Sequence, residues 1–437
     1  MGHVMNANLR EITHRVRGSI IAVATGLVAS LATAAGTAQE YQVTRPPAEF
    51  RVGFNRVFDG SARRLSRAHS GPLRSHVHPG WAGGQLSIHS FGLGPFYQKY
   101  ISAGGYPIVS SRRVNDYALR EAAYLVNLML AKRPDVRRAM IDSGSRMVIM
   151  AHDEYTTDVP EYEYLQPNDY WDARARGLGG SQDDPICSAA EENVLAFPGD
   201  PYSKECILIH EFAHNIHLRG LIRVDPTFDR RLKEAYDVAM AGGLWRRKYA
   251  ATNHHEYWAE GVQSWFDNNR PPDHDHNHVD TRKELIEYDP RLAKLCHEVF
   301  GDTKLVYTKP ATRLTGHLAG YDPSKAPRFR WPQRLKDIHL DVQLKWLAGP
   351  GEKTFRSKPR GRRTWVLFDN RSERRVKLHW VNYRGRAVPR GEIGPGRMAP
   401  HRTTSGSAWL ITDMAGKPLG RFVAEREVSQ AKIPDEK

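Results

Sequence analysis

The chain has 437 residues, of which 40% are hydrophobic, 10% aromatic and 26% charged, and its formal net charge at pH 7 is +15. This composition indicates a globular protein, and the length is too great for one compact core, so we expect at least two domains. No nucleic-acid-binding motif accompanies the positive charge, so nucleic acid is not an expected partner.

Residues 1–38 have the pattern of a secretory signal peptide. Three arginines between positions 10 and 17 precede an apolar run of small residues that ends at Ala38. Cleavage after Ala38 would remove three Arg and one Glu and leave a net charge of +13 (15 − 3 + 1). An uncleaved membrane anchor is the alternative. We expect a secreted, periplasmic or cell-surface protein with no integral membrane segment after cleavage.

Residues 39–345 are expected to form the first domain. Within it, residues 114–132 carry apolar side chains at helical spacing and predict an amphipathic helix, and a shorter helix should end at Ile141. The sequence RMVIMA at residues 146–151 predicts a short buried strand. This strand is either an ordinary core strand or a sheet edge that holds an extended peptide substrate.

Residues 200–220 contain the pattern His-Glu-x-x-His at His210, Glu211 and His214. An Asp-Pro start and a Gly end predict one helix through the whole stretch. At 3.6 residues per turn the two imidazoles lie on one face, while Glu211 points about 100° away. Neutral imidazoles bind zinc, and a carboxylate beside the metal can accept a proton from water. The alternative is a buried apolar helix with incidental histidines.

A third metal ligand has more than one candidate. His217 lies near the same face as the two motif histidines, and it is either a structural residue or a ligand. Residues 253–269 predict a second helix, on which Glu256 and Glu260 are four apart and share a face. On an ordinary surface helix these two carboxylates would simply be solvated.

The sequence HEFAH followed by EYWAE resembles the gluzincin metallopeptidases, and most closely the protease domain of the anthrax lethal factor type. Tyr249, seven residues before Glu256, matches that group as well. The resemblance covers residues 200–270 and implies a zincin-like domain that binds Zn²⁺. Carried over residue by residue, it implies His210, His214 and Glu256 as zinc ligands, Glu211 as general base, Tyr249 as oxyanion donor and Glu260 as the outer partner of a ligand histidine.

Three cysteines follow the signal segment, at positions 187, 206 and 296. In an oxidising compartment a bridge between Cys187 and Cys206 would anchor the start of the motif helix, and three buried thiols are the alternative. The sequence DHDHNH at residues 273–278 predicts either a metal-binding loop or a solvated loop.

The composition changes after a basic linker at residues 346–359. Short alternating runs separated by turn residues predict a small antiparallel β-module over residues 360–427, followed by a tail at 428–437. Basic residues cluster between positions 356 and 377, where they form either a site for anionic cell-surface polymers or a solvated face.

The β-module resembles the β-domain of the von Hippel-Lindau tumour suppressor, and residues 370–413 align with it without a gap. The shared residues include Asn370, Arg371, Ser372, Val376, Trp380, Asn382, Gly385, Pro389, Pro395, Gly396, Gly406, Trp409, Leu410 and Asp413. The family's domain binds a hydroxyproline-containing peptide. Its pocket Trp matches Trp409, but the Tyr, Ser and His positions fall on Arg390, Thr403 and Ser407. The resemblance implies a docking module with a protein ligand, and a purely stabilising domain is the alternative.

Together these patterns predict an α+β protein in which a zincin-like metallopeptidase domain precedes a small all-β sandwich. We expect a secreted Zn²⁺-dependent peptidase that acts on peptide or protein substrates. The alternative is a non-catalytic extracellular binding protein with a structural zinc site. A structural site needs no free base at Glu211 and is usually closed by a fourth protein ligand.

Overall fold

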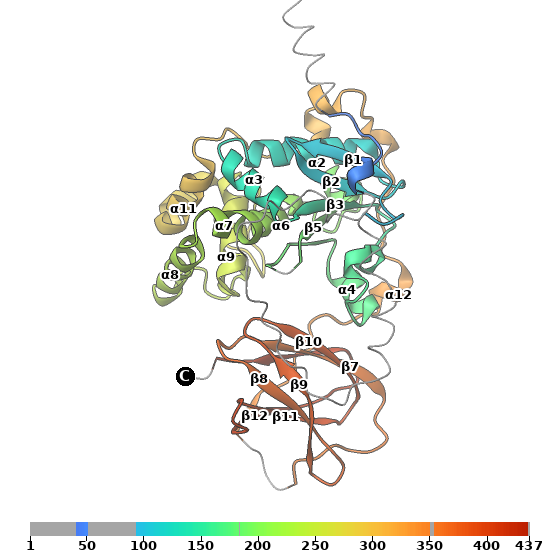
Figure 1. Ribbon diagram of the computed structural model, residues 1–437, viewed down its shortest axis with the longest axis vertical. Helices are drawn as coiled ribbons and strands as arrows, with labels where there is room; N and C mark the ends of the chain where they lie inside the picture. The colour runs from blue at the N-terminus through green and yellow to red at the C-terminus, as the bar shows by residue number, and fades with distance from the viewer. Residues whose placement is uncertain (1–40, 51–92, 183, 350–353, 436–437) are drawn as a thin grey trace, which may run out of the picture.

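A computed structural model describes residues 41–50, 93–182, 184–349 and 354–435. The predicted signal peptide, residues 1–38, lies outside the described residues. Within them, no helix has the length and apolar character needed to cross a membrane. The described part is mixed α/β, and its C-terminal region is built of β-strands alone (Figure 1).

The first region is organised on a five-stranded sheet with the order β1-β2-β3-β5-β4. Only β2/β3 and β3/β5 are parallel pairs, while β1/β2 and β4/β5 are antiparallel. Residues of β3 and β5 alternate between two hydrophobic clusters on the two faces of the sheet, so both faces are covered. The strands are β1 (Lys99–Ala103), β2 (Tyr106–Ser110), β3 (Arg146–Met150), β4 (Gly177–Leu178) and β5 (Ile186–Ala190).

Helices α2, α3 and α6 contact strands of this sheet and form the main core with it. The predicted helix at 114–132 is confirmed as α2 (Asp116–Met129), whose N-cap Asn115 accepts from the Tyr117 amide. The shorter helix is confirmed as α3 (Pro134–Asp142). The remaining helices are α4 (Asn168–Arg174), α5 (Glu191–Val194), α6 (Ile207–Asn215), α7 (Ile222–Val224), α8 (Phe228–Ala241), α9 (His254–Trp265), α10 (Arg282–Tyr288), α11 (Pro290–Phe300) and α12 (Gln333–Lys336).

The strand predicted at 146–151 is confirmed as β3, but its proposed role as a substrate edge is wrong. β3 pairs with β2 on one side and β5 on the other, so its backbone groups are already hydrogen-bonded. The sheet edge near the motif helix is β4 instead, which contacts α6.

The motif helix is shorter at its start than the sequence predicts. α6 begins at Ile207 with Cys206 as N-cap, while the Asp200 carboxylate accepts from the Tyr202 amide in a separate turn. Side chains from elsewhere cap the helix, since Asn268 Oδ1 accepts from the Cys206 amide at 2.8 Å and Asn193 Oδ1 from the Ile207 amide at 2.8 Å. Such caps are invisible to a local sequence pattern.

The end of the motif helix also differs from the prediction. α6 continues directly into a π-helix, Ile216–Leu221, and then into α7. Gly220 does not terminate the helix, because it lies inside the π-helix. A Cβ at Gly220 would meet Val136 at 2.6 Å and Met140 at 2.8 Å, so glycine is needed there for close packing on α3.

The C-terminal region is a sandwich of a three-stranded sheet, β10-β7-β13, and a five-stranded sheet, β6-β12-β11-β8-β9. Its apolar core includes Phe368, Trp409 and Phe422. The strands are β6 (Leu347–Ala348), β7 (Arg363–Asn370), β8 (Val376–Val381), β9 (Ala387–Ile393), β10 (Met398–Thr404), β11 (Ala408–Thr412), β12 (Pro418–Val423) and β13 (Ser429–Ile433).

The sandwich extends beyond residues 360–427 at both ends. Leu344 is buried in its core, and β6 pairs with β12, so part of the expected linker belongs to the sandwich. Strand β13 pairs in parallel with β7, so the expected tail supplies an edge strand of the three-stranded sheet. Figure 1 shows the sandwich beneath α4 and α12, and Gln430 of β13 donates to the Tyr170 hydroxyl of α4 at 2.6 Å.

Candidate metal centre

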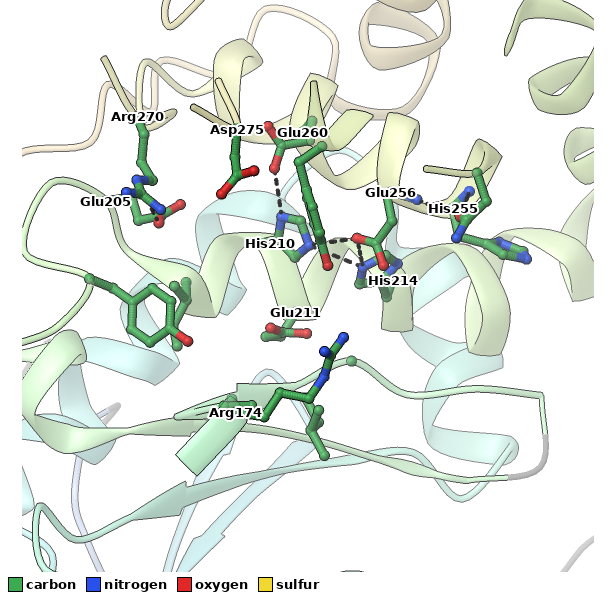
Figure 2. A pocket seen from close by; sticks show the side chains of 18 of the residues that line it. Arg174, Glu205, His210, Glu211, His214, His255, Glu256, Glu260, Arg270 and Asp275 are labelled. Carbon is green, nitrogen blue, oxygen red and sulfur yellow. Dashed lines mark hydrogen bonds and ion pairs between the residues drawn. The ribbon is translucent and has the colours of Figure 1, made fainter. Parts of the chain in front are cut away.

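Helices α6 and α9 pack against each other and bring three potential metal ligands together. His210 and His214 lie one turn apart on α6, and Glu256 lies in the first turn of α9. The Asn253 side chain fixes that first turn, because it accepts from the backbone amides of His255 and Glu256. Figure 2 shows the three side chains converging on one another.

The three donor atoms have the spacing that a tetrahedral zinc ion requires. His210 Nε2 lies 3.2 Å from His214 Nε2, and Glu256 Oε2 lies 3.1 Å from the former and 3.3 Å from the latter. Zinc–nitrogen and zinc–oxygen bonds of roughly 2.0–2.1 Å at tetrahedral angles place neighbouring ligand atoms about 3.3 Å apart. Nitrogen and carboxylate donors in this arrangement therefore fit Zn²⁺.

A residue outside the ligand set orients His210 by contacting Nδ1, the ring nitrogen that faces away from the metal position. His210 Nδ1 lies 2.8 Å from Gln263 Oε1, whereas the carboxylate of Glu260 is 3.5 Å away. Gln263 in turn donates to Glu205 at 2.8 Å. Sequence reasoning selected Glu260 as the outer partner and missed Gln263, although Gln263 follows Glu256 by seven residues and so shares its face of α9.

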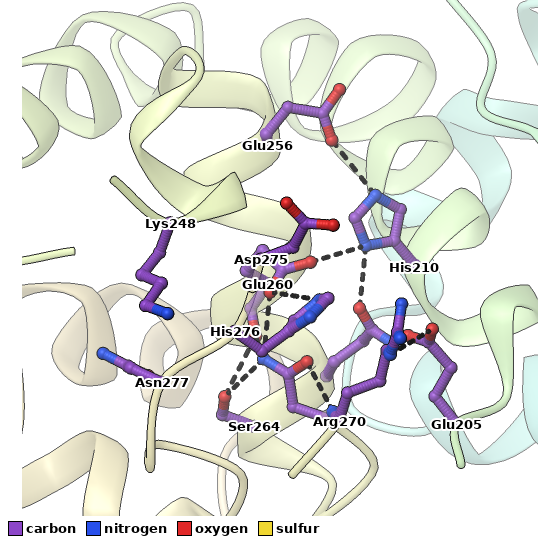
Figure 3. Close-up of polar contacts among 12 residues, drawn as sticks. Glu205, His210, Lys248, Glu256, Glu260, Ser264, Arg270, Asp275, His276 and Asn277 are labelled. Atoms are coloured by element: carbon purple, nitrogen blue, oxygen red, sulfur yellow. Dashed lines mark hydrogen bonds and ion pairs between the residues drawn. The ribbon is translucent and has the colours of Figure 1, made fainter. Parts of the chain in front are cut away.

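Glu260 belongs to a second set of polar contacts, which Figure 3 shows. Its Oε2 accepts from Asn269 at 3.1 Å and lies 3.5 Å from His276 Nε2. His276 is 7% exposed and its Nδ1 lies 2.9 Å from Asp273, whereas the His274 side chain is 96% exposed, so the DHDHNH loop is solvated at its tip and buries only His276. The loop contributes a wall of the site instead of a separate metal-binding group.

The site is rich in carboxylates and favours positive charge. Burial lowers the pKa of His210, but Glu256 and Glu211 outweigh it and raise that pKa to about 10. Burial opposes ionisation of Glu256, yet His214 and His210 hold the pKa of its carboxyl well below the usual range. A dication bound by these groups would supply the charge that the carboxylates require.

Glu211 and Tyr249 stand beside the three donors. Burial raises the pKa of the Glu211 carboxyl, against the opposing effect of His210. Tyr249 is in a short 3-10 turn before α9, and its ring centroid lies 6.1 Å from that of His210. The charge of Glu256 raises the pKa of Tyr249 well above its ordinary value, so its hydroxyl stays protonated and can donate a hydrogen bond at neutral pH.

These groups open into a cavity of about 580 Å³. One wall is the edge strand β4 and the two glycines that follow it. A Cβ at Gly179 would lie 2.7 Å from His214, so glycine permits the chain to pass close to α6. Figure 2 shows Arg174 pointing into the cavity near Glu211. The cavity residues that sequence reasoning missed include Arg174, Tyr202, Glu205 and Arg270.

His217 lies apart from the three donors. It is fully buried in the π-helix, and its Nε2 lies 3.0 Å from Asp229 of α8. His217 therefore does not join His210, His214 and Glu256. The predicted bridge between Cys187 and Cys206 is wrong, because both thiols are free and buried. Cys187 accepts instead from the Asn215 side chain at 3.2 Å.

Of the family's pocket positions, only Trp409 keeps the residue type. Trp409 is 2% exposed and packs in the core, with its ring centroid 4.9 Å from that of Phe368. Arg390 lies over the Trp380 ring at 5.4 Å, while Ser407 is buried beside Thr404.

Comparison with known proteins identifies the C-terminal region alone. No curated protein matches the chain. The resemblance of residues 200–270 to the lethal factor type therefore stays a prediction. The family model of the VHL beta domain matches residues 355–430, which confirms the resemblance predicted for the sandwich.

Proposed function

We propose that this protein is a zinc-dependent peptidase. The observation that carries the proposal is the convergence of His210 Nε2, His214 Nε2 and Glu256 Oε2 at 3.1–3.3 Å, at the wall of a cavity of about 580 Å³. Within the described residues, no fourth protein donor completes this group. Three protein ligands and an open position are typical of a catalytic site, whereas a structural site is usually closed by a fourth ligand.

Each surrounding residue has a role in peptide hydrolysis. A zinc ion held by the three ligands would act as a Lewis acid and would lower the pKa of a water bound to it to about 7. Glu211 then accepts the proton of the attacking water and passes it to the leaving amine. Tyr249 donates a hydrogen bond to the oxyanion that develops on the scissile carbonyl. Gln263 holds His210 in the orientation that directs Nε2 toward the ligand position.

The sheet edge indicates how a substrate would bind. β4 ends the sheet and lines the cavity, so an extended peptide can pair with its free side. Arg174 offers a cation to a carbonyl or carboxylate of that peptide. We further propose that the protein is secreted and that the sandwich docks a protein partner, with its face near α4 placed close to the Arg174 end of the cavity.

Replacing Glu211 tests the proposal. In Glu211→Gln the amide cannot accept the proton, so zinc content should be unchanged while turnover of a peptide library falls by about 10²- to 10⁴-fold. Metal analysis and the library assay on residues 39–437 measure both quantities. Removal of zinc with a chelator, followed by its return, provides the control. Unchanged turnover in Glu211→Gln would remove Glu211 from the mechanism.

A further inference from the structure

A second group of potential ligands lies on the other side of the α6–π-helix junction. His217 belongs to the π-helix, Asp229 to the first turn of α8, and His255 to the first turn of α9. One donor atom from each residue lies within 4.8 Å of the other two. Within the residues that the structure describes, only this trio and the His210 trio have such an arrangement.

His217 supplies an independent sign that something binds here. Its side chain is 0% exposed, and Nε2 has no hydrogen-bond partner, although Asp229 Oδ1 lies 3.0 Å away. The two atoms are close but not aligned for a hydrogen bond. The other ring nitrogen, Nδ1, lies 3.5 Å from His255 Nδ1. A buried nitrogen without a partner is costly, and a cation between Nε2 and the carboxylate would satisfy it.

We propose that His217, Asp229 and His255 form a second binding site for a divalent transition metal, with Zn²⁺ as the cation it fits best. Two imidazole donors and one carboxylate favour zinc and its neighbours over Ca²⁺ and Mg²⁺, which prefer oxygen. His254 is the outer partner, since its Nε2 lies 3.1 Å from Asp229 Oδ1 and its ring lies 4.0 Å from that of His255.

Binding requires a modest inward movement of side chains. The donor atoms of the three residues lie within 4.8 Å of one another, whereas ligand atoms around tetrahedral zinc lie about 3.3 Å apart. The donor atoms must therefore approach one another by up to roughly 1.5 Å. Asp229, with a side chain 42% exposed, and the half-buried His255 have room to move, whereas His217 is fixed by burial. Water can occupy the remaining coordination position on the exposed side.

The site would join the elements that carry the first centre. His217 follows His214 by three residues, His255 immediately precedes Glu256, and His255 also lines the main cavity. A cation held by both residues would fix the start of α9 against α6. The second metal would therefore also hold Glu256 in place for the first centre.

Counting zinc in single variants tests this site. The full chain, treated with a chelator and then given ZnCl₂, should bind two zinc ions per chain. Asp229→Asn and His255→Gln should each bind one, whereas the matched variants Asp237→Asn, on the exposed side of α8, and His274→Gln, whose side chain is 96% exposed, should bind two. Circular dichroism checks that each variant is folded, and the partly exposed Asp229 provides a change that spares the core.

The outcome separates this site from the proposed peptidase centre. One zinc in the wild type that is lost in His214→Ala and kept in Asp229→Asn would overturn the second site and leave the first. One zinc that is lost in Asp229→Asn and kept in His214→Ala would support the second site and refute the peptidase. Two zinc ions retained in both Asp229→Asn and His255→Gln would overturn the second site as well.

Discussion

The two regions of this molecule bury different kinds of side chain. Around α6 and α9, the first region buries His210, His214, Glu260 and Gln263, each less than 10% exposed. The core of the sandwich is formed by aromatic and aliphatic residues, and the polar side chains that it buries, such as Asn370 and Ser429, are uncharged. Burying titratable groups costs free energy unless each has a partner, so a region that does so has a geometry to maintain. This difference supports the proposed metal centre in the first region and is consistent with the proposed docking role of the sandwich.

The two regions are also recognised from different signals. The first is predicted from a few residues in two helices, and those residues indicate a reaction without specifying the rest of the fold. The sandwich is matched over most of its length, yet Arg390, Thr403 and Ser407 occupy the positions that would indicate a ligand. A short motif therefore predicts a type of chemistry, while a resemblance over a long stretch predicts a fold.

The largest expected effect concerns Glu256, because it decides whether the first region holds a catalytic metal. Glu256→Ala should remove one zinc per chain and reduce hydrolysis to background, a larger loss than the roughly 10- to 100-fold typical of an outer partner. Zinc analysis and the peptide assay measure both. Glu287→Ala, on the exposed face of α10, is the control and should change neither. Full hydrolysis in Glu256→Ala would send the search for the third ligand back to the histidines.

Tyr249 should have the next largest effect. Tyr249→Phe removes one hydrogen-bond donor from the developing oxyanion, so kcat should fall about 100- to 1000-fold while the zinc content is unchanged. Tyr383→Phe, at an exposed tyrosine of the sandwich, is the matched control. An unaltered kcat in Tyr249→Phe would show that the oxyanion is stabilised by another group, with Arg174 the first to examine.

Gln263 distinguishes the observed outer partner from the one that the sequence predicts. Because Gln263 lies 2.8 Å from His210 Nδ1 and Glu260 lies 3.5 Å from it, Gln263→Met should weaken zinc binding by about 10- to 100-fold, more than Glu260→Gln. Competition with a chelator of known affinity measures the zinc Kd of each variant. The reverse order of the two effects would restore Glu260 to the role that the resemblance implies.

Local patterns predict the parts of the site that depend on helical spacing. The proximity of His210 and His214 follows from their four-residue separation, whereas only the gluzincin resemblance assigns Glu256 to the same metal. The start of α6 could not be predicted, because its caps come from Asn193 and Asn268, far away in the sequence. The cavity wall at Arg174 and the free state of Cys187 likewise depend on tertiary packing alone.

Changes in the sandwich should affect hydrolysis least. The sharpest test of this region concerns how many residues the sandwich needs in order to fold. The family model spans residues 355–430, but Leu344, Ala431 and Ile433 are buried in the sandwich core. A fragment of residues 342–435 should fold cooperatively and be more stable than a fragment of 355–430 by at least about 3 kcal/mol, since truncating one buried aliphatic side chain typically costs about 2–5 kcal/mol. Urea unfolding followed by tryptophan fluorescence measures the difference. Leu344→Ala in the longer fragment should fall between the two. Equal stability of both fragments would show that β6 and β13 contribute no net stability to the sandwich, and that the family span alone is the folding unit.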